Sequence, residues 1–225
     1  MYEVKLKKSI WVIGDVHGDI NKLKILLNKI YKEDPEPNIC FVGDLIDRGE
    51  FSSDVVELVK ENYFCVLGNH EVVMIHPDNV KDSNYRIGWF GIGGEETYSS
   101  YYDKKNLLKS HIAWIKNLPL IIKFVIKNEK PLFVSHSGFD IDNLDSIDSE
   151  FVLWNKKSKY PVSETAINIF GHKITPIQKS ILSKSHICID SGGYKDFNKD
   201  KGIGFLTAIN YPSLKTIYSY DEVIN

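Results

Sequence analysis

Arginine is scarce in this sequence. Of the 28 lysine and arginine residues, only Arg48 and Arg86 are arginines, and 30 aspartate and glutamate residues leave a formal net charge of -2 at pH 7. General nucleic-acid-binding proteins carry a cationic excess, so the charge balance excludes that class of partner. A guanidinium binds phosphate through a planar pair of hydrogen bonds that lysine cannot make. Any phosphate site in this chain therefore has few arginines available to it.

Cysteine is also sparse, with only Cys40, Cys65 and Cys188. No disulfide framework or zinc motif has the spacing it needs, and the first two thiols stand in apolar runs, where they act as small hydrophobic groups. Residues 1–9 are charged rather than signal-like, and no apolar run reaches the roughly 20 residues of a membrane span. We therefore expect a cytoplasmic protein with no membrane contact.

The remaining composition is that of a folded globular protein, with 43% hydrophobic and 26% charged residues. A chain of 225 residues is long enough to bury one core. We expect a single domain over residues 1–225, with a monomer as its assembly. Residues 77–84 form the most polar loop, which we interpret as an insertion or a lid.

Short apolar runs rich in β-branched and aromatic residues predict buried strands. Leucine, isoleucine and valine at helical spacing predict one helix after each of the first two strands, and residues 95–118 are predicted to be helical as well. Residues 205–210 and 214–220 predict a C-terminal hairpin. The order β-α-β-α-β implies a sheet covered by helices, which is the α/β class. The predicted strands are residues 10–13, 38–42, 63–67, 132–135, 167–170 and 186–189.

Polar residues follow directly after five of these strands. In open α/β sheets, ligands bind beyond the carboxyl ends of the strands, so we expect these polar side chains to gather at one edge. The segments are GDVHG (14–18), GDLIDRG (43–49), GNHE (68–71), SHSG (135–138) and GH (171–172).

Six residues of these segments form a mixed oxygen and nitrogen donor set. Two carboxylates, three imidazoles and one amide suit Mn²⁺, Fe or Zn²⁺ rather than a thiolate-bound metal. Six donors are too many for one metal that keeps an open position, so we predict two metals that share a carboxylate. Metal pairs about 3.5–4 Å apart favour in-line displacement at phosphorus. The six residues are Asp15, His17, Asp44, Asn69, His136 and His172.

The remaining histidines, His76, His111 and His186, do not follow strand ends in this way. We interpret them as surface or structural histidines.

The order and spacing of GDVHG, GDLIDRG and GNHE resemble the signature of the phosphoprotein phosphatase family of binuclear, calcineurin-like metallophosphoesterases. The later SHSG, GH-x-x-x-P and IDSG segments, and residues 89–101, are similar to its small bacterial and phage serine/threonine phosphatase branch. The resemblance covers nearly the whole chain. It implies a four-layer αββα fold, in which a β-sandwich is flanked by helices.

The resemblance also divides the six donors between two divalent metal ions. Asp44 would bridge the two ions. We expect Mn²⁺ to support activity in vitro, with Fe or Zn²⁺ as alternatives. The first metal would take Asp15 and His17, and the second would take Asn69, His136 and His172.

Three further residues receive catalytic roles from the same resemblance. His70 would protonate the leaving oxygen, and Asp47 would fix the tautomer and charge of His70. Arg48 would bind the phosphate oxygens as charge develops in the transition state. The nucleophile would be a metal-bridging hydroxide that attacks phosphorus in line, without a phosphoenzyme.

Two positions depart from the family pattern. Protein phosphatases of the family usually carry arginine immediately before GNHE, where this chain has Leu67, and another after the Trp-Asn pair, where it has Lys156. Lys156 keeps the charge without the bidentate fork, and we assign it to substrate binding. Lys173, beside His172, either replaces lost charge or is solvated. Leu67 is similar instead to the symmetrical dinucleoside tetraphosphate hydrolases.

We therefore predict a metal-dependent phosphatase that hydrolyses phosphomonoesters, with phosphoserine and phosphothreonine in proteins ahead of phosphotyrosine. The expected partner is a phosphorylated protein or a small phosphoester. Leu67 and the missing arginines leave hydrolysis of dinucleoside polyphosphates or other nucleotides as the first alternative. A metal-binding scaffold without catalysis is the second. An acidic stretch over residues 140–150, if it borders the site, would favour a neutral or basic peptide over a polyanion.

Overall fold

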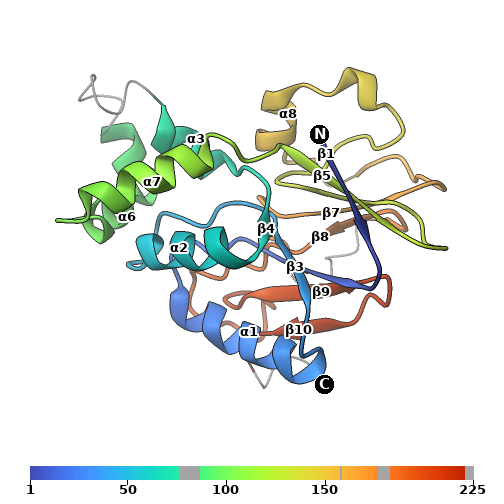
Figure 1. The fold of residues 1–225 in the computed structure, drawn as a ribbon, viewed down its shortest axis with the longest axis horizontal. Coiled ribbons are helices and arrows are strands. Elements are labelled where there is room, and N and C mark those ends of the chain that lie inside the picture. The colour runs from blue at the N-terminus through green and yellow to red at the C-terminus, as the bar shows by residue number, and fades with distance from the viewer. Residues whose placement is uncertain (77–86, 158, 177–182, 221–225) are drawn as a thin grey trace.

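The computed structural model describes residues 1–76, 87–157, 159–176 and 183–220. Its strands form two five-stranded sheets that face each other (Figure 1). Sheet A contains, in order, β1 (Tyr2–Leu6), β5 (Ile121–Ile126), β6 (Leu132–Ser135), β7 (Ile167–Phe170) and β8 (His186–Cys188). Sheet B contains, in order, β10 (Thr216–Tyr218), β9 (Thr207–Tyr211), β2 (Ile10–Ile13), β3 (Asn38–Phe41) and β4 (Phe64–Cys65).

The space between the two sheets is apolar. Successive side chains of a strand point to opposite faces, so Ile10 and Val12 of β2 pack toward sheet A, whereas Trp11 and Ile13 pack toward helices. Phe124 of β5 is fully buried on the other side of the same inner layer. This layer holds the two sheets together and therefore fixes how their ends meet.

Helices cover the outer faces of both sheets. Helices α1 (Ile20–Glu33) and α2 (Ser52–Asn62) bury their apolar faces on sheet B. On sheet A, α8 (Ser149–Trp154) contributes Val152 to a small outer core with Phe133. The predicted β-sandwich flanked by helices is therefore confirmed.

The middle of the chain differs from the prediction in detail. The helix expected over residues 95–118 is divided into α6 (Glu95–Ser100) and α7 (Lys105–Ile115), and Asp103 between them has a φ of 57°. A π-helical turn, η1 (Phe90–Gly94), precedes α6. The loop over residues 77–84, interpreted as a lid, lies outside the described residues.

Two strands, β1 and β5, and several short helical segments were not predicted from the sequence. β1 runs parallel to β5 at the edge of sheet A, and its side chains are mostly exposed. An edge strand with one solvated face carries no apolar run that a pattern search would detect. The short helices α3 (Asn69–Ile75) and α8 and the 3₁₀ turn η2 (Leu144–Ser146) are too brief to show a clear helical period.

The topology brings the predicted site residues to one edge of the sandwich. β2, β3 and β4 are parallel, as are β6, β7 and β8, so the segments after them leave their sheets in a common direction. No helix in the described part of the chain is long and apolar enough to cross a bilayer.

The inner apolar layer predicts the effect of one substitution. Phe124→Ala should lower the free energy of unfolding by about 3–5 kcal/mol, because it leaves a cavity between the two sheets. Phe51→Ala, at a side chain that is 40% exposed, is the matched control and should change it by less than about 1 kcal/mol. Urea denaturation of the two variants measures the difference, and equal losses would contradict the assigned inner core.

Candidate metal centre and active site

Strained backbone marks the segments that follow the strands. A positive φ is uncommon outside glycine and costs free energy that other contacts must offset. Five of the predicted site residues adopt it, with φ values between 49° and 71°. The five are His17, Asp44, Asp47, Arg48 and His172.

Glu71 holds the strained turn after β3. This side chain is fully buried, and its carboxylate accepts hydrogen bonds from the backbone N–H groups of Asp44 and Leu45, both at 2.8 Å. It also accepts from the N–H of Gly68 at 3.1 Å. One carboxylate therefore links the turn that carries Asp44 to the start of α3, which carries Asn69.

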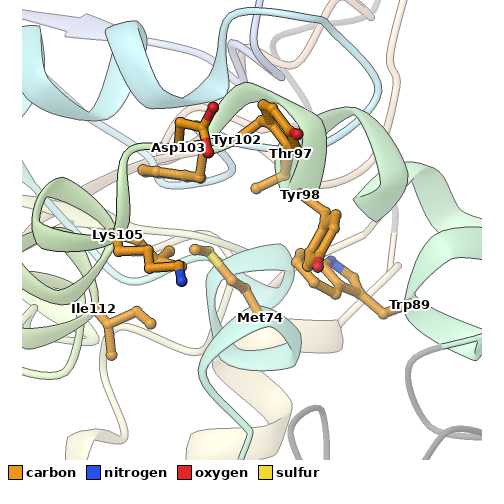
Figure 2. A pocket seen from close by; sticks show the side chains of 10 residues that line it. Met74, Trp89, Thr97, Tyr98, Tyr102, Asp103, Lys105 and Ile112 are labelled. Carbon is orange, nitrogen blue, oxygen red and sulfur yellow. The ribbon is translucent and has the colours of Figure 1, made fainter.

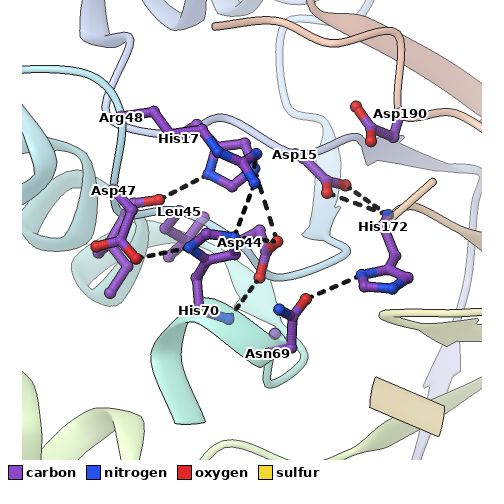
Figure 3. A network of polar contacts seen from close by, with 12 residues as sticks. Asp15, His17, Asp44, Leu45, Asp47, Arg48, Asn69, His70, His172 and Asp190 are labelled. Atoms are coloured by element: carbon purple, nitrogen blue, oxygen red, sulfur yellow. Dashed lines mark hydrogen bonds and ion pairs between the residues drawn. The ribbon is translucent and has the colours of Figure 1, made fainter. Parts of the chain in front are cut away.

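Three predicted donors, Asn69, His136 and His172, lie on one side of Asp44, and Figure 3 shows Asn69 and His172 beside it. Nδ1 of His136 donates to the Val42 carbonyl at 2.9 Å, and burial lowers the pKa of this imidazole, so Nε2 carries a lone pair. That nitrogen lies 2.7 Å from Asn69 Oδ1 and 3.4 Å from Asp44 Oδ1. His172 completes the group, with Nδ1 at 2.9 Å from Asn69 Oδ1.

These contacts join groups that repel one another without a cation. His136 Nε2, Asn69 Oδ1 and Asp44 Oδ1 are all acceptors, and three buried acceptors at these distances have no proton to share. Nε2 of His172 is also buried without a hydrogen-bond partner among the described residues. The donor chemistry therefore fits a divalent metal ion.

A second group of donors lies on the other side of Asp44. Nδ1 of His17 donates to the Ile46 carbonyl at 2.8 Å, and Nε2 lies 3.6 Å from Asp44 Oδ2. His17, Asp44 and His70 have ligand atoms close enough for one ion, as do Asp44, His136 and His172. Asp44 belongs to both groups, which is the position that a bridging carboxylate requires.

Asp15 is placed differently from the other predicted ligands. It is buried, and both carboxylate oxygens accept from the backbone N–H of His172 at 3.1–3.2 Å. Burial, together with the nearby charges of Asp190 and Asp44, raises its pKa well above the usual value. Asp15 is therefore held on the His172 side of the site, and its oxygens are not among the ligand atoms of either group.

Burial drives most ligand groups toward their neutral forms. It lowers the pKa of His17 to about 3 and, with help from neighbouring His136, that of His172 to about 4. It raises the pKa of Asp190 to about 6. Burial would also raise the pKa of Asp44, but three neighbouring imidazoles outweigh it and the pKa is lowered. A bound cation would supply the opposite charge that the carboxylates lack.

His70 and Asp47 form a buried pair next to these donors. His70 Nδ1 donates to Asp47 Oδ2 at 2.6 Å. Trp89 Nε1 donates to the same carboxylate oxygen at 3.0 Å, and Thr97 Oγ1 donates to Oδ1 at 2.7 Å. Burial would lower the pKa of His70, but Asp44 and Asp47 outweigh it, and the pKa is raised.

Arg48 contacts the two histidines of the group that contains His17, Asp44 and His70. Nη2 donates to His70 Nε2 at 3.0 Å, and Nη1 contacts His17 Nε2. Its backbone N–H donates to the carbonyl of Gly93 at 2.8 Å. Gly93 has a φ of 105°, and a Cβ there would lie 2.7 Å from the Arg48 nitrogen. The close approach therefore requires glycine.

The other predicted substrate-binding residue, Lys156, lies on the exposed rim beyond α8. Its charge contributes to the lowered pKa of His172, which indicates that it lies on the His172 side of the site. Its backbone carbonyl accepts from Lys173 Nζ at 3.0 Å. No direct contact joins Lys156 to Arg48 among the described interactions.

The histidines set aside in the sequence do not join either donor group. His111 is buried between Tyr101, at 2.7 Å, and Glu57, and Nε2 of His186 donates to the Phe139 carbonyl at 2.8 Å. These two are structural, as predicted.

Sequence reasoning missed several residues that shape the site. Asp190 follows β8 and faces Asp15 across the site (Figure 3), and its place at a strand end was the available signal. The roles of Glu71, Trp89 and Thr97 had no such signal, because each acts through contacts with distant segments.

Trp89 and Thr97, which contact Asp47, also line a cavity of about 540 Å³ (Figure 2). None of the predicted metal donors lines it, so it is separate from the donor cluster. Its walls are mostly apolar and aromatic and include Met74, Tyr98, Tyr101, Leu108 and Ile112.

Comparison with known proteins gives a consistent result. The family model of calcineurin-like phosphoesterases matches residues 8–206. Serine/threonine-protein phosphatase 2 of Salmonella typhimurium is 26% identical over 202 residues, which cover 84% of this chain and 89% of that protein. The symmetrical bis(5'-nucleosyl)-tetraphosphatase of Buchnera aphidicola is 32% identical over 144 residues, covering 58% of this chain and 44% of that protein.

A similar fold occurs in a crystal structure described provisionally as that of a diadenosine tetraphosphatase. The TM-score is 0.60 and the identity 19%, with 96% of each chain covered.

The shared position of Asp44 predicts how metal binding responds to substitution. Mn²⁺ at about 100 times its dissociation constant should stabilise the chelator-treated protein by about 2.7 kcal/mol, by mass action. Asp44→Asn should abolish most of this gain, because it removes the charge common to both groups, whereas the exposed control Asp145→Asn should keep it. Thermal unfolding with and without Mn²⁺ measures both, and an unchanged gain in Asp44→Asn would refute the assignment.

Proposed function

Because the chain belongs to the calcineurin-like phosphoesterase family, we propose that it hydrolyses phosphomonoesters and that phosphoserine and phosphothreonine in proteins are its main substrates. Phosphotyrosine is a further candidate. The observation that carries the proposal is the buried His70–Asp47 pair at two donor groups that share Asp44, one of which includes His70 itself. A scaffold without catalysis has no need for such a pair.

We further propose that residues 1–225 act as one catalytic unit. The ligands would be those predicted from the sequence: Asp15 and His17 for one ion, Asn69, His136 and His172 for the other, and Asp44 for both. Two bound divalent ions would neutralise phosphate charge and supply water with a pKa lowered toward about 7. Mn²⁺ is the proposed metal in vitro, with Fe or Zn²⁺ as alternatives.

The chain's own residues divide the remaining tasks. Arg48 would bind phosphate oxygens through its planar donors. His70 would give a proton from Nε2 to the leaving oxygen, because Nδ1 is committed to Asp47. The raised pKa of His70 favours the form with a proton on both nitrogens, and in that form Arg48 would donate to the phosphate instead of to Nε2. Trp89 and Thr97, which both donate to the Asp47 carboxylate, would keep that carboxylate and therefore the imidazole in one orientation.

The surroundings of α8 support a protein substrate. Asp148 and Glu150, from the acidic stretch, line a hollow with Trp154. The Trp154 ring lies edge-on to His172, with 6.2 Å between ring centroids. A negatively charged hollow next to the donors would repel a polyanion and attract a neutral or basic peptide.

Hydrolysis of dinucleoside polyphosphates is the second candidate. Leu67, at a position where arginine is usual, packs against the apolar core and lies between α3 and the Pro119 carbonyl, to which its N–H donates at 2.9 Å. With Lys156 on the rim, Arg48 is the one arginine at the site in the described part of the chain. A similar protein from Buchnera carries the name of a dinucleotide hydrolase.

The cytoplasmic location and monomeric assembly stay predictions. The three cysteines are free and buried, which suits a reducing compartment. Cell fractionation and gel filtration test the two statements.

The role proposed for His70 predicts a selective loss of turnover. His70→Asn should reduce Mn²⁺-dependent hydrolysis of p-nitrophenyl phosphate by about 100-fold or more, the usual scale for a general acid. The Mn²⁺-induced gain in thermal stability should remain, because His70 is proposed to transfer a proton rather than to hold a metal. Unchanged turnover in His70→Asn would contradict the catalytic role of His70. Loss of the Mn²⁺-induced stability gain would indicate that His70 is a metal ligand instead.

A substrate panel separates the two candidate functions. The wild-type protein with Mn²⁺ should release phosphate from a phosphoserine or phosphothreonine peptide faster than it cleaves diadenosine tetraphosphate at equal concentration. The reverse order would favour the dinucleotide. Leu67→Arg provides a second test, with an unchanged melting temperature as its control. A large increase in phosphopeptide hydrolysis by this variant would count against a phosphopeptide as the natural substrate.

A further inference from the structure

Tyr194, on the loop that follows β8, packs directly against Arg48. The guanidinium carbon lies 4.3 Å from the centroid of the Tyr194 ring. The same ring also packs against His17 in a T-shaped arrangement, with 5.1 Å between ring centroids and an angle of 83° between the planes. Tyr194, from the loop after β8, therefore contacts both Arg48 and the predicted metal ligand His17.

Lys22 of α1 holds this loop in place. Its ammonium group donates to the backbone carbonyl of Gly193 at 2.5 Å and to that of Lys195 at 3.0 Å. It also pairs with Asp19 at 3.3 Å, the residue whose carboxylate caps α1. Both residues that flank Tyr194 are thus tied to a helix that begins just after the GDVHG segment.

The stacking geometry suits an arginine that must bind an anion. A cation over an aromatic face gains about 0.5–2 kcal/mol, and contact through the face leaves the N–H donors of the guanidinium free in its plane. The gain therefore does not depend on whether those donors point at His17 and His70 or at a phosphate.

Ordering of this side chain matters more here than in a site with several arginines. An arginine side chain loses roughly 2 kcal/mol of rotamer entropy when it is fixed, and a binding group that is already ordered avoids that loss on binding. Leu67 and Lys156 stand where further arginines are usual in the family, so Arg48 has no second guanidinium to share its task among the described site residues.

We propose that Tyr194 and Lys22 are positioning residues that fix Arg48 for phosphate binding: Tyr194 supplies the stacking face, and Lys22 fixes the loop that presents it. The inference rests on the proposed function, because it takes phosphate as the ligand of Arg48.

Oxyanion affinity tests the stack without requiring turnover. In Mn²⁺-loaded protein, Tyr194→Leu should weaken tungstate binding, measured by calorimetry, about five- to tenfold, in line with a lost cation–π contact. The Michaelis constant for p-nitrophenyl phosphate should rise by a similar factor, with a smaller change in kcat. Tyr194→Phe keeps the ring and should restore most of the affinity. Tyr102→Leu, at an exposed tyrosine, is the control.

Lys22→Met tests the loop contact and should weaken tungstate binding in the same direction by a smaller factor. Lys24→Met, on the exposed side of the same helix, should leave the affinity unchanged. Equal affinities for the two lysine variants would overturn the part assigned to Lys22.

A double-mutant cycle decides whether Tyr194 acts through Arg48. In an Arg48→Ala background, Tyr194→Leu should cause no further loss of tungstate affinity. An equal loss in both backgrounds, or no loss in either, would overturn the proposal. A wild-type protein that hydrolyses no phosphoester would refute the proposed function instead, and the tungstate measurements would still decide the positioning role.

Discussion

The organisation of the site depends on one electrostatic constraint: acceptor groups are held together where no solvent can separate them. His136 Nε2 lies 2.7 Å from Asn69 Oδ1 and 3.4 Å from Asp44 Oδ1, and all three residues are buried. Such a group is unfavourable without a cation. Favourable contacts elsewhere in the fold must therefore offset the repulsion between these acceptors. The inner apolar layer fixes the two sheets, and the four-way contacts of Glu71 fix the turn after β3. Strained φ values at five site residues are the local cost of this arrangement.

The histidines of the site differ in the hydrogen-bond partner of Nδ1. Asp47 accepts from His70, Trp89 and Thr97, so its carboxylate is fully used and has no free oxygen to offer a metal. His136 and His17 instead donate their Nδ1 protons to backbone carbonyls, which turns their other nitrogens toward Asp44. The partner of one ring nitrogen thus decides how each of these neighbouring histidines presents the other nitrogen.

The scarcity of arginine has a structural counterpart. One guanidinium lies between His17 and His70, its backbone is held by Gly93, and its face is covered by Tyr194. Among the described residues, this single site arginine is surrounded by contacts from three distant segments. The hollow beside Trp154 is lined by the acidic residues Asp148 and Glu150, so its negative charge disfavours polyanions.

The sequence by itself determined the chemistry of the donors and the sheets that carry them. Strand-forming runs and the donors that follow them are adjacent in the chain, so local patterns were enough to predict β2, β3, β6 and β7 and the residues Asp44, Asn69, His136 and His172. The edge strand β1 and the break between α6 and α7 were decided by packing. Tertiary structure alone brought Trp89 and Thr97 to Asp47, 42 and 50 residues away, and Lys22 to the Tyr194 loop, 171 residues from Gly193. Contacts across such separations leave no period or spacing in the sequence, because only the closed sandwich brings their partners together.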